Sequence, residues 1–299
     1  TADRESDTVT TVKQGSDGTF EADETFPSGE EPVYVAISDV NSDGEPDLVS
    51  VLSRDGEESR GALVVRLADE NGVIGGQRQL PAPFMPTLVT VIHTVGSTAM
   101  DIISAGVSDS PVVEILVGGG DGTFTPGPVI PLPTTPIDLA VGNVTDTSVR
   151  DVIVSFGGAL NETRIYTGDE NGFSLALTIP DAVNVLTGSV IKDVVGVELI
   201  TAAPSNSKNN VISVYNLRGV SETPAPLATA DVEGGIVVDL AFGDFNRDDL
   251  PDIAAVGYGG VGQPETLPIT AMGSVLATMT MPPHMAFGIA AVLRDPTAQ

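Results

Sequence analysis

Short apolar runs separated by turn residues recur along the chain. One unit of this pattern has apolar runs at Val33–Ser38, Leu48–Leu52 and Ala62–Ala68. Runs of this length, rich in Val, Ile and Leu, predict β-strands, and no stretch of any length shows the period of an amphipathic helix. The first two runs are almost entirely apolar, which is typical of strands covered on both faces. The pattern therefore predicts an all-β protein.

Two sets of residues give this unit a period near 50 residues. The first set consists of turn glycines, many of them in Asp-Gly or Asn-Gly pairs that favour tight hairpins: Gly18, Gly72, Gly122, Gly172, Gly219 and Gly273. The second set consists of acidic residues that precede the second run of each unit: Asp47, Asp101, Asp151, Glu198 and Asp252. Two independent markers with one period of this length fit the four-stranded blades of a β-propeller.

We therefore predict a single β-propeller domain of about six four-stranded blades over residues 1–299. Five blades lie near residues 32–85, 86–135, 136–183, 184–234 and 235–282, and a last blade combines 283–299 with 1–31. Sharing one blade between the two ends would remove exposed sheet edges. The second strand of that blade has no candidate in the sequence, so seven blades stay open if the chain is a fragment. Its first residue is Thr1 and not Met, so we expect a mature or excised segment, and membership of a larger polypeptide stays open.

The stretch between the first two strands of the first predicted blade has the spacing of a cation-binding loop. It reads Asp39-Val40-Asn41-Ser42-Asp43-Gly44-Glu45-Pro46-Asp47, with oxygen-bearing side chains at positions one, three, five and nine and glycine at six. Hard cations such as Ca²⁺ take about six to eight oxygen ligands, and such a loop turns alternate side chains toward one point. We expect Asp39, Asn41, Asp43, Asp47 and the backbone carbonyl of Glu45 to bind Ca²⁺. The alternative is a polar hairpin turn.

The same spacing returns at residues 244–252, directly after Phe242-Gly243. The expected ligands of this second loop are Asp244, Asn246, Asp248, Asp252 and the backbone carbonyl of Leu250. In both loops the last acid leads straight into a strand-like run, whereas an EF-hand ends with a Glu at position twelve and lies between helices. Both copies resemble the FG-GAP/VCBS repeats of integrin-alpha-like β-propellers, and weaker copies extend the resemblance along the chain. It implies an adhesion module, or one that recognises a protein or glycan.

The other predicted blades lack this set of ligands. The corresponding stretches run from His93 to Asp101, from Asn143 to Asp151 and from Lys192 to Glu198, and none has enough carboxylates for Ca²⁺. The closing acid is nevertheless present in every copy. We therefore expect that it also accepts backbone N–H bonds across the turn, and that the chain has two calcium sites.

The charge of the chain restricts its partners. It carries 41 acidic and 13 basic residues, a net charge of −28. Such a surface repels nucleic acid and anionic membranes, so we expect neither as a partner. The longest apolar region, Ser274–Leu293, is interrupted by prolines and is not expected to insert into a membrane. Adaptation to high salt and a plain acidic secreted protein both explain the charge, and Cys is absent.

Candidates for catalysis are few. The two histidines, His93 and His284, have no identifiable nucleophile as partner, so the sequence favours a binding module over an enzyme and leaves the enzyme as the alternative. Aromatic residues make up 4% of the chain and Trp is absent, which leaves little surface for stacking sugars.

The predicted architecture separates two ends of the blades. The cation loops stiffen one end, and irregular connections at the other end are where recognition usually occurs. These connections lie near residues 53–61, 108–111, 156–163, 204–210 and 258–265. Calcium at millimolar concentration outside cells suits such loops. We therefore predict an extracellular or cell-surface, calcium-stabilised binding or adhesion module. The alternatives are a secreted polysaccharide lyase or hydrolase and a purely structural domain of a larger surface protein.

Overall fold

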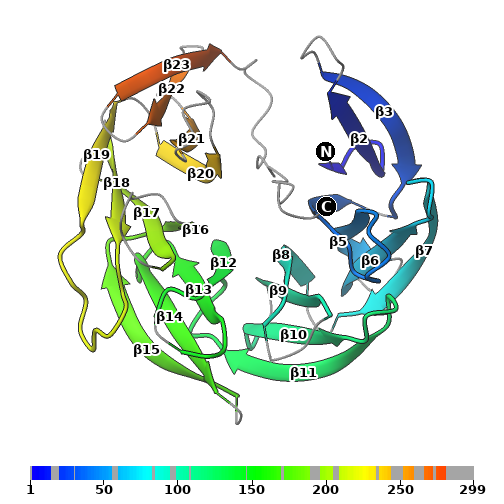
Figure 1. The fold of residues 1–299 in the computed structure, drawn as a ribbon, viewed down its shortest axis with the longest axis horizontal. Coiled ribbons are helices and arrows are strands. Elements are labelled where there is room, and N and C mark those ends of the chain that lie inside the picture. The colour runs from blue at the N-terminus through cyan, green and yellow to red at the C-terminus, as the bar shows by residue number, and fades with distance from the viewer. Residues whose placement is uncertain are drawn as a thin grey trace. The chain divides into compact units, whose positions relative to one another are not determined.

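Among the residues that the computed structural model describes, all regular secondary structure is β (Figure 1). The structure describes residues 2–14, 20–29, 31–55, 60–82, 85–94, 99–107, 109–145, 147–169, 172–188, 196–204, 209–233, 236–243, 252–258, 266–271 and 274–280. The chain divides into two compact units, Thr1–Pro136 and Ile137–Gln299.

The first unit contains three antiparallel sheets in which the strands follow one another in sequence order. One sheet has three strands, β1 (Ala2–Asp3), β2 (Thr8–Gln14) and β3 (Phe20–Pro27). The next has four, β4 (Pro32–Ser38), β5 (Asp47–Asp55), β6 (Arg60–Ala68) and β7 (Ile74–Pro81). The third also has four, β8 (Met85–Ile92), β9 (Asp101–Val107), β10 (Val112–Gly118) and β11 (Phe124–Pro131).

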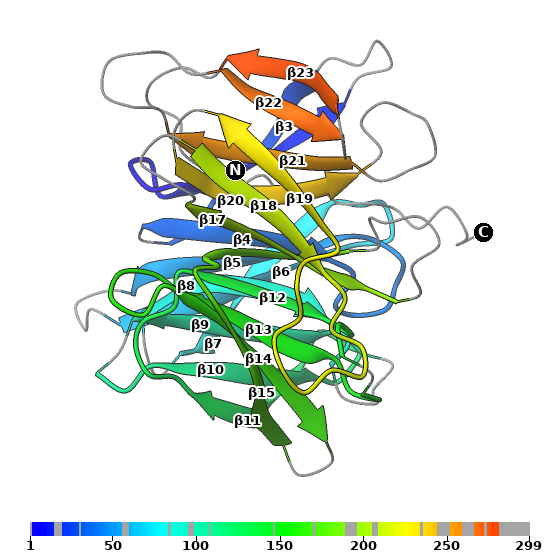
Figure 2. The same cartoon turned by 90° about the vertical axis from the view of Figure 1, so that its left-hand side faces the viewer.

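The second unit contains three four-stranded antiparallel sheets with the same strand order. They are β12 (Asp138–Gly142), β13 (Asp151–Phe156), β14 (Glu162–Asp169) and β15 (Gly172–Pro180); β16 (Asn184–Gly188), β17 (Glu198–Pro204), β18 (Asn209–Tyr215) and β19 (Ala228–Glu233); and β20 (Ile236–Gly243), β21 (Asp252–Tyr258), β22 (Thr266–Ala271) and β23 (Ser274–Thr280). The segment between β18 and β19 runs beside β15, where Thr223 Oγ1 donates to the carbonyl of Thr178 at 2.7 Å (Figure 2).

These sheets confirm the predicted fold class, an all-β protein of four-stranded propeller-type blades. The runs at Val33–Ser38, Leu48–Leu52 and Ala62–Ala68 form β4, β5 and β6, as predicted. The number of blades and the single domain over residues 1–299 stay predictions. The predicted contribution of residues 283–299 to a last blade lies outside the described residues.

Apolar side chains hold neighbouring sheets together face to face within each unit. In the first unit, Val49 and Leu63 of one sheet and Ile102 of the next are fully buried in one cluster. In the second unit, Ile153 and Leu199 occupy the same kind of position. The first strands of successive sheets also meet, β4 with β8, β12 with β16 and β16 with β20. Burial on both faces explains why the second strands are almost entirely apolar.

Glycine permits the closest approach between the first two strands of the sheet β8–β11. A Cβ added to Gly106 would lie 2.6 Å from the Pro86 Cα and would also strike the backbone of Met85, whereas one added to Gly76 meets nothing within 4 Å. Because backbone atoms cannot move aside as a side chain can, we expect Gly106→Ala to lower the free energy of unfolding by about 1–3 kcal/mol. The matched Gly76→Ala variant should be neutral or up to about 1 kcal/mol more stable. Urea denaturation measures both, and equal effects would contradict this packing.

Candidate functional site

The loop between β4 and β5 turns its polar side chains toward its own backbone. The amide nitrogen of Asp43 lies 3.2 Å from both Asp39 Oδ1 and Asn41 Oδ1, so these two oxygens lie close to one point. Gly44 N donates to Asp39 Oδ2 and Glu45 N donates to Asp43 Oδ1, each at 2.9 Å. Asn41 Nδ2 also donates to Asp43 Oδ2 at 2.7 Å. The structure therefore brings the side chains at the first three predicted ligand positions together.

Two residues with positive φ produce this turn. Gly44, at the predicted position six, has a φ of 93°, and Ser42 has a φ of 63°. Glycine adopts such a conformation without steric cost, whereas a serine needs surrounding contacts to hold it there. The hydrogen bonds of Asp39 and Asn41 to the next residue, Asp43, supply such contacts.

Asp47 closes the loop from the first residue of β5, and it is fully buried. Its Oδ2 accepts the N–H of Val40 and its Oδ1 accepts the N–H of Ala68, both at 2.8 Å. Burial raises the pKa of Asp47 above its ordinary value, and the carboxylates of Asp43 and Asp39 add to the increase. Since Ala68 is the last residue of β6, one carboxylate joins the start of the loop to the third strand.

The loop fits a hard cation in the type and spacing of its oxygen donors. A carboxylate has about four lone-pair sites, so the N–H bonds that Asp39, Asp43 and Asp47 accept leave further sites for a ligand. Within the described ranges, no three His, Cys, Asp or Glu side chains are grouped closely enough to hold a metal ion. Asp47 differs from the other donors because it is fully buried and its two oxygens bond to backbone N–H groups of two separate segments, the start of the loop and the end of β6.

The sheet β8–β11 of the first unit repeats these two backbone bonds of the closing acid, which we call the clamp, without the cation loop. Asp101, the first residue of β9, is fully buried. Its Oδ2 accepts the N–H of Thr94, and its Oδ1 accepts the N–H of Gly118, both at 3.0 Å. The hydroxyl of Thr94 donates to the same Oδ2. Gly118 ends β10, so Asp101 makes the same two backbone connections as Asp47.

In the second unit, Asp151 is buried in the same position and surrounded partly by hydroxyl groups. Its Oδ2 accepts the N–H of Thr145 at 2.8 Å, and its Oδ1 accepts the hydroxyls of Thr145 at 2.8 Å and of Thr147 at 3.2 Å. Burial raises the pKa of Asp151 above its ordinary value. Glu198, the corresponding acid of the following sheet, is also fully buried.

The prediction that the closing acid accepts backbone N–H bonds across the turn is confirmed for Asp47, Asp101 and Asp151. The sequence did not predict the second bond of the closing acid, which it accepts from the N–H of the last residue of the third strand. It spans 21 residues from Asp47 and 17 from Asp101, so no fixed spacing could have revealed it.

The second predicted cation loop is not described. Asp244, Asn246, Asp248 and Leu250 lie outside the described residues, and for Asp252 the structure gives only its place at the start of β21, opposite Gly243. Calcium binding at both loops stays a prediction.

His93 contacts the backbone of its own loop. Its Nδ1 lies 2.7 Å from the carbonyl oxygen of Ala99, so Nδ1 carries the proton that this bond needs. This bond fixes the ring against the backbone of the loop. His284 lies outside the described residues.

At the opposite end of the blades, the structure describes all of one expected recognition segment, residues 156–163. Its turn is fixed to the next connection, because Asn161 Nδ2 donates to Asp181 Oδ1 at 2.9 Å and Asp181 N donates to Asn161 O at 2.8 Å. The other four expected recognition segments are described only in part, because the structure does not describe residues 56–59, 108, 205–208 and 259–265.

Comparisons with known proteins find likeness in fold but not in sequence. No protein-family model and no curated protein matches the chain. Among solved structures, BBS1N in complex with ARL6DN matches in two crystals, soaked with mercury and with lead. The BBS1N sequences are 15% and 14% identical to this chain, and the TM-scores are 0.46 and 0.44. Each match covers 84% of this chain, and the two cover 88% and 89% of the BBS1N chains. Rhamnogalacturonan lyase YesW is 11% identical, with 90% of this chain and 66% of the lyase covered and a TM-score of 0.41. Likenesses of this extent assign neither a family nor a function.

The described part of the chain contains no helix that is long and apolar enough to cross a membrane.

The clamp predicts unequal effects of the same substitution in two sheets. Both oxygens of Asp101 face backbone N–H groups, so the amide of Asp101→Asn must point its NH₂ at one of them. Leaving such a buried donor unpaired costs about 1–3 kcal/mol. In Asp151→Asn the NH₂ can face the threonine hydroxyls, which can turn and accept. Urea denaturation should therefore show the larger loss for Asp101→Asn, and equal losses would contradict the clamp.

Proposed function

We propose that the chain is an extracellular or cell-surface binding module, stabilised by calcium, that recognises a protein or a glycan through loops at the end of the blades opposite the cation loops. The observation that carries the proposal is the convergence of Asp39, Asn41 and Asp43 around the Gly44 turn. Oxygen donors at alternate positions of a loop that turns at a glycine are the arrangement that hard cations require.

Calcium would neutralise carboxylates that otherwise repel one another, and so stabilise the end of the sheet. Asp39, Asn41 and Asp43 would hold it together with Asp47 and the carbonyl of Glu45. The second ion would be held by the corresponding residues of the other loop, Asp244, Asn246, Asp248, Leu250 and Asp252.

The resemblance of the two loops to FG-GAP/VCBS repeats, with Phe242-Gly243 before the second, supports the extracellular setting and the role in adhesion. A rigid sheet end and irregular connections at the other end form a scaffold on which loops commonly recognise partners. The net charge of −28 favours partners other than nucleic acid.

Calcium should raise the melting temperature, because an ion that binds only the folded chain stabilises it by about 2.7 kcal/mol at a hundredfold excess over Kd. Asp43→Ala should remove one of two bound ions in calorimetric titration, since it deletes a central carboxylate. Asp3→Ala is the matched control: Asp3 is also exposed and accepts the N–H of Glu5 at 3.0 Å in a turn outside the loop. This control should retain both ions. A melt unaffected by EDTA would rule out calcium stabilisation.

A search for the partner tests the binding role itself. The protein in millimolar calcium should bind a restricted set of probes on a glycan array or an array of extracellular protein domains, and EDTA should weaken that binding. Turnover of polysaccharides by the purified chain, in the absence of selective binding, would favour the enzyme over the binding module.

A further inference from the structure

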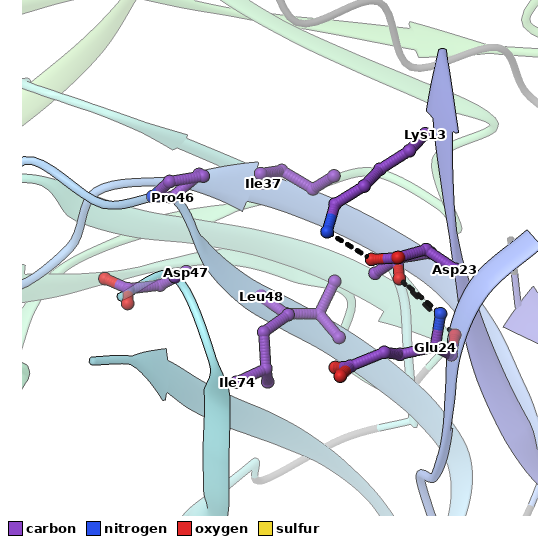
Figure 3. A pocket seen from close by; sticks show the side chains of 10 residues that line it. Lys13, Asp23, Glu24, Ile37, Pro46, Asp47, Leu48 and Ile74 are labelled. Atoms are coloured by element: carbon purple, nitrogen blue, oxygen red, sulfur yellow. Dashed lines mark hydrogen bonds and ion pairs between the residues drawn. The ribbon is translucent and has the colours of Figure 1, made fainter. Parts of the chain in front are cut away.

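A hollow of about 170 Å³ lies in the first unit between the strands β2 and β3 and the sheet β4–β7 (Figure 3). Its floor is apolar and includes Ile37, Leu48 and Ile74, and Ile37 remains 39% exposed. Lys13, Asp23 and Glu24 line the opposite side. Figure 3 shows the side chain of Glu24 extending over the floor toward Leu48 and Ile74. The hollow thus combines an apolar floor with a charged rim.

A β-bulge places the acidic residues at this rim. Asp23 and Glu24 of β3 together oppose the single residue Thr11 of β2. The hydroxyl of Thr11 fixes the bulge, because it accepts the N–H of Glu24 at 3.1 Å. Bulges of this kind re-aim side chains.

The bulge recurs in the next two sheets but without acidic residues. Gly75-Gly76 opposes Leu67 in one sheet, and Gly127-Pro128 opposes Ile115 in the other. The carboxylates at the hollow are therefore a feature of one blade and not a requirement of the bulge.

The rim is negative even after its internal ion pair is counted. Lys13 Nζ lies 2.7 Å from Asp23 Oδ2. The bond to Asp23 raises the pKa of Lys13, and Glu24 contributes as a second nearby carboxylate. One ammonium thus faces two carboxylates. The net charge of the whole chain, −28, adds to the attraction for cations.

The size and lining of the hollow restrict what it can bind. An engineered cavity of about 150 Å³ holds one benzene molecule, so this hollow is the size of one long side chain and is too small for an oligosaccharide. No aromatic ring lines it, so stacking with a sugar is absent. Lysine and arginine have an apolar stem and a cationic end, which match an apolar floor and an acidic rim.

We propose that this hollow docks a lysine or arginine side chain of a basic partner polypeptide, with the stem on Ile37, Leu48 and Ile74 and the cation at Glu24. The site lies beside the cation loop, at the end of the blade away from the recognition loops proposed above. Asp47, an expected calcium ligand, also lines the hollow, whereas Glu24 and Ile37, the residues tested below, are not expected ligands. The test is therefore made at one fixed calcium concentration, so that its outcome is separate from that of the calcium titration.

Fluorescence anisotropy of labelled pentalysine, at about 0.15 M salt where the Debye length is about 8 Å, measures docking with long-range attraction screened. Glu24→Gln should weaken binding about two- to fivefold, as expected for one exposed ion pair. Ile37→Ser should weaken it about three- to tenfold through loss of apolar contact. The controls are Glu222→Gln, which makes the same change at an exposed position elsewhere, and Val129→Ser, which replaces another exposed β-branched apolar residue by serine; both should have little effect. Equal losses in the variants and their controls would overturn the proposal.

Lys13→Gln is expected to strengthen binding, which a misfolded variant would not do. Removing the competing ammonium should strengthen pentalysine binding, and more than Arg150→Gln does, although both variants change the net charge by the same amount. Weaker binding by Lys13→Gln, or equal gains in the two variants, would contradict docking in the hollow.

Discussion

A buried acid at the first residue of the second strand, present in four successive described sheets, is the constraint on which the ends of the sheets β4–β7 and β8–β11 depend. A charge removed from water is tolerated only when it is well hydrogen-bonded. Asp47 and Asp101 meet this requirement with N–H groups from two places, the start of the preceding loop and the last residue of the third strand. The acid therefore fixes the relative positions of three strands and the direction in which the loop leaves the sheet. The apolar contacts between sheets stabilise the blades, whereas this carboxylate positions their ends.

The same clamp allows the residues of the loop to differ between blades. In the first four-stranded sheet the loop gathers Asp39, Asn41 and Asp43. In the next sheet His93 bonds to the carbonyl of Ala99, and in the second unit Thr145 and Thr147 direct hydroxyls at Asp151. The candidate cation site is thus an addition to a structural element that other blades keep in simpler form. Adhesion or recognition at the opposite end would use the rigidity that this element provides.

The sequence predicted the parts of this account that depend on local spacing. Runs of apolar residues located β4, β5 and β6, and the period of the closing acids located the clamp and its bonds across the turn. The partners of Asp47 at Ala68 and of Asp101 at Gly118 could not be predicted, because they depend on the length of each connection and on strand register. The hollow at Glu24 was missed for the same reason. It arises where a bulge in one sheet faces Ile37 of another, and neither stretch carries a local pattern that indicates the other.

Amide hydrogen exchange of the clamp residues is the most direct test of this account. The N–H groups of Val40 and Thr94 lie in loops, yet they bond to buried carboxylates, so they should exchange as slowly as the amides of the core strands. The N–H groups of Asn71 and Val73 also bond to a carboxylate, that of Asp69, but on an exposed hairpin, and they should exchange much faster. Exchange of Val40 and Thr94 at the rates of Asn71 and Val73 would contradict the claim that the buried acids hold the blade ends together.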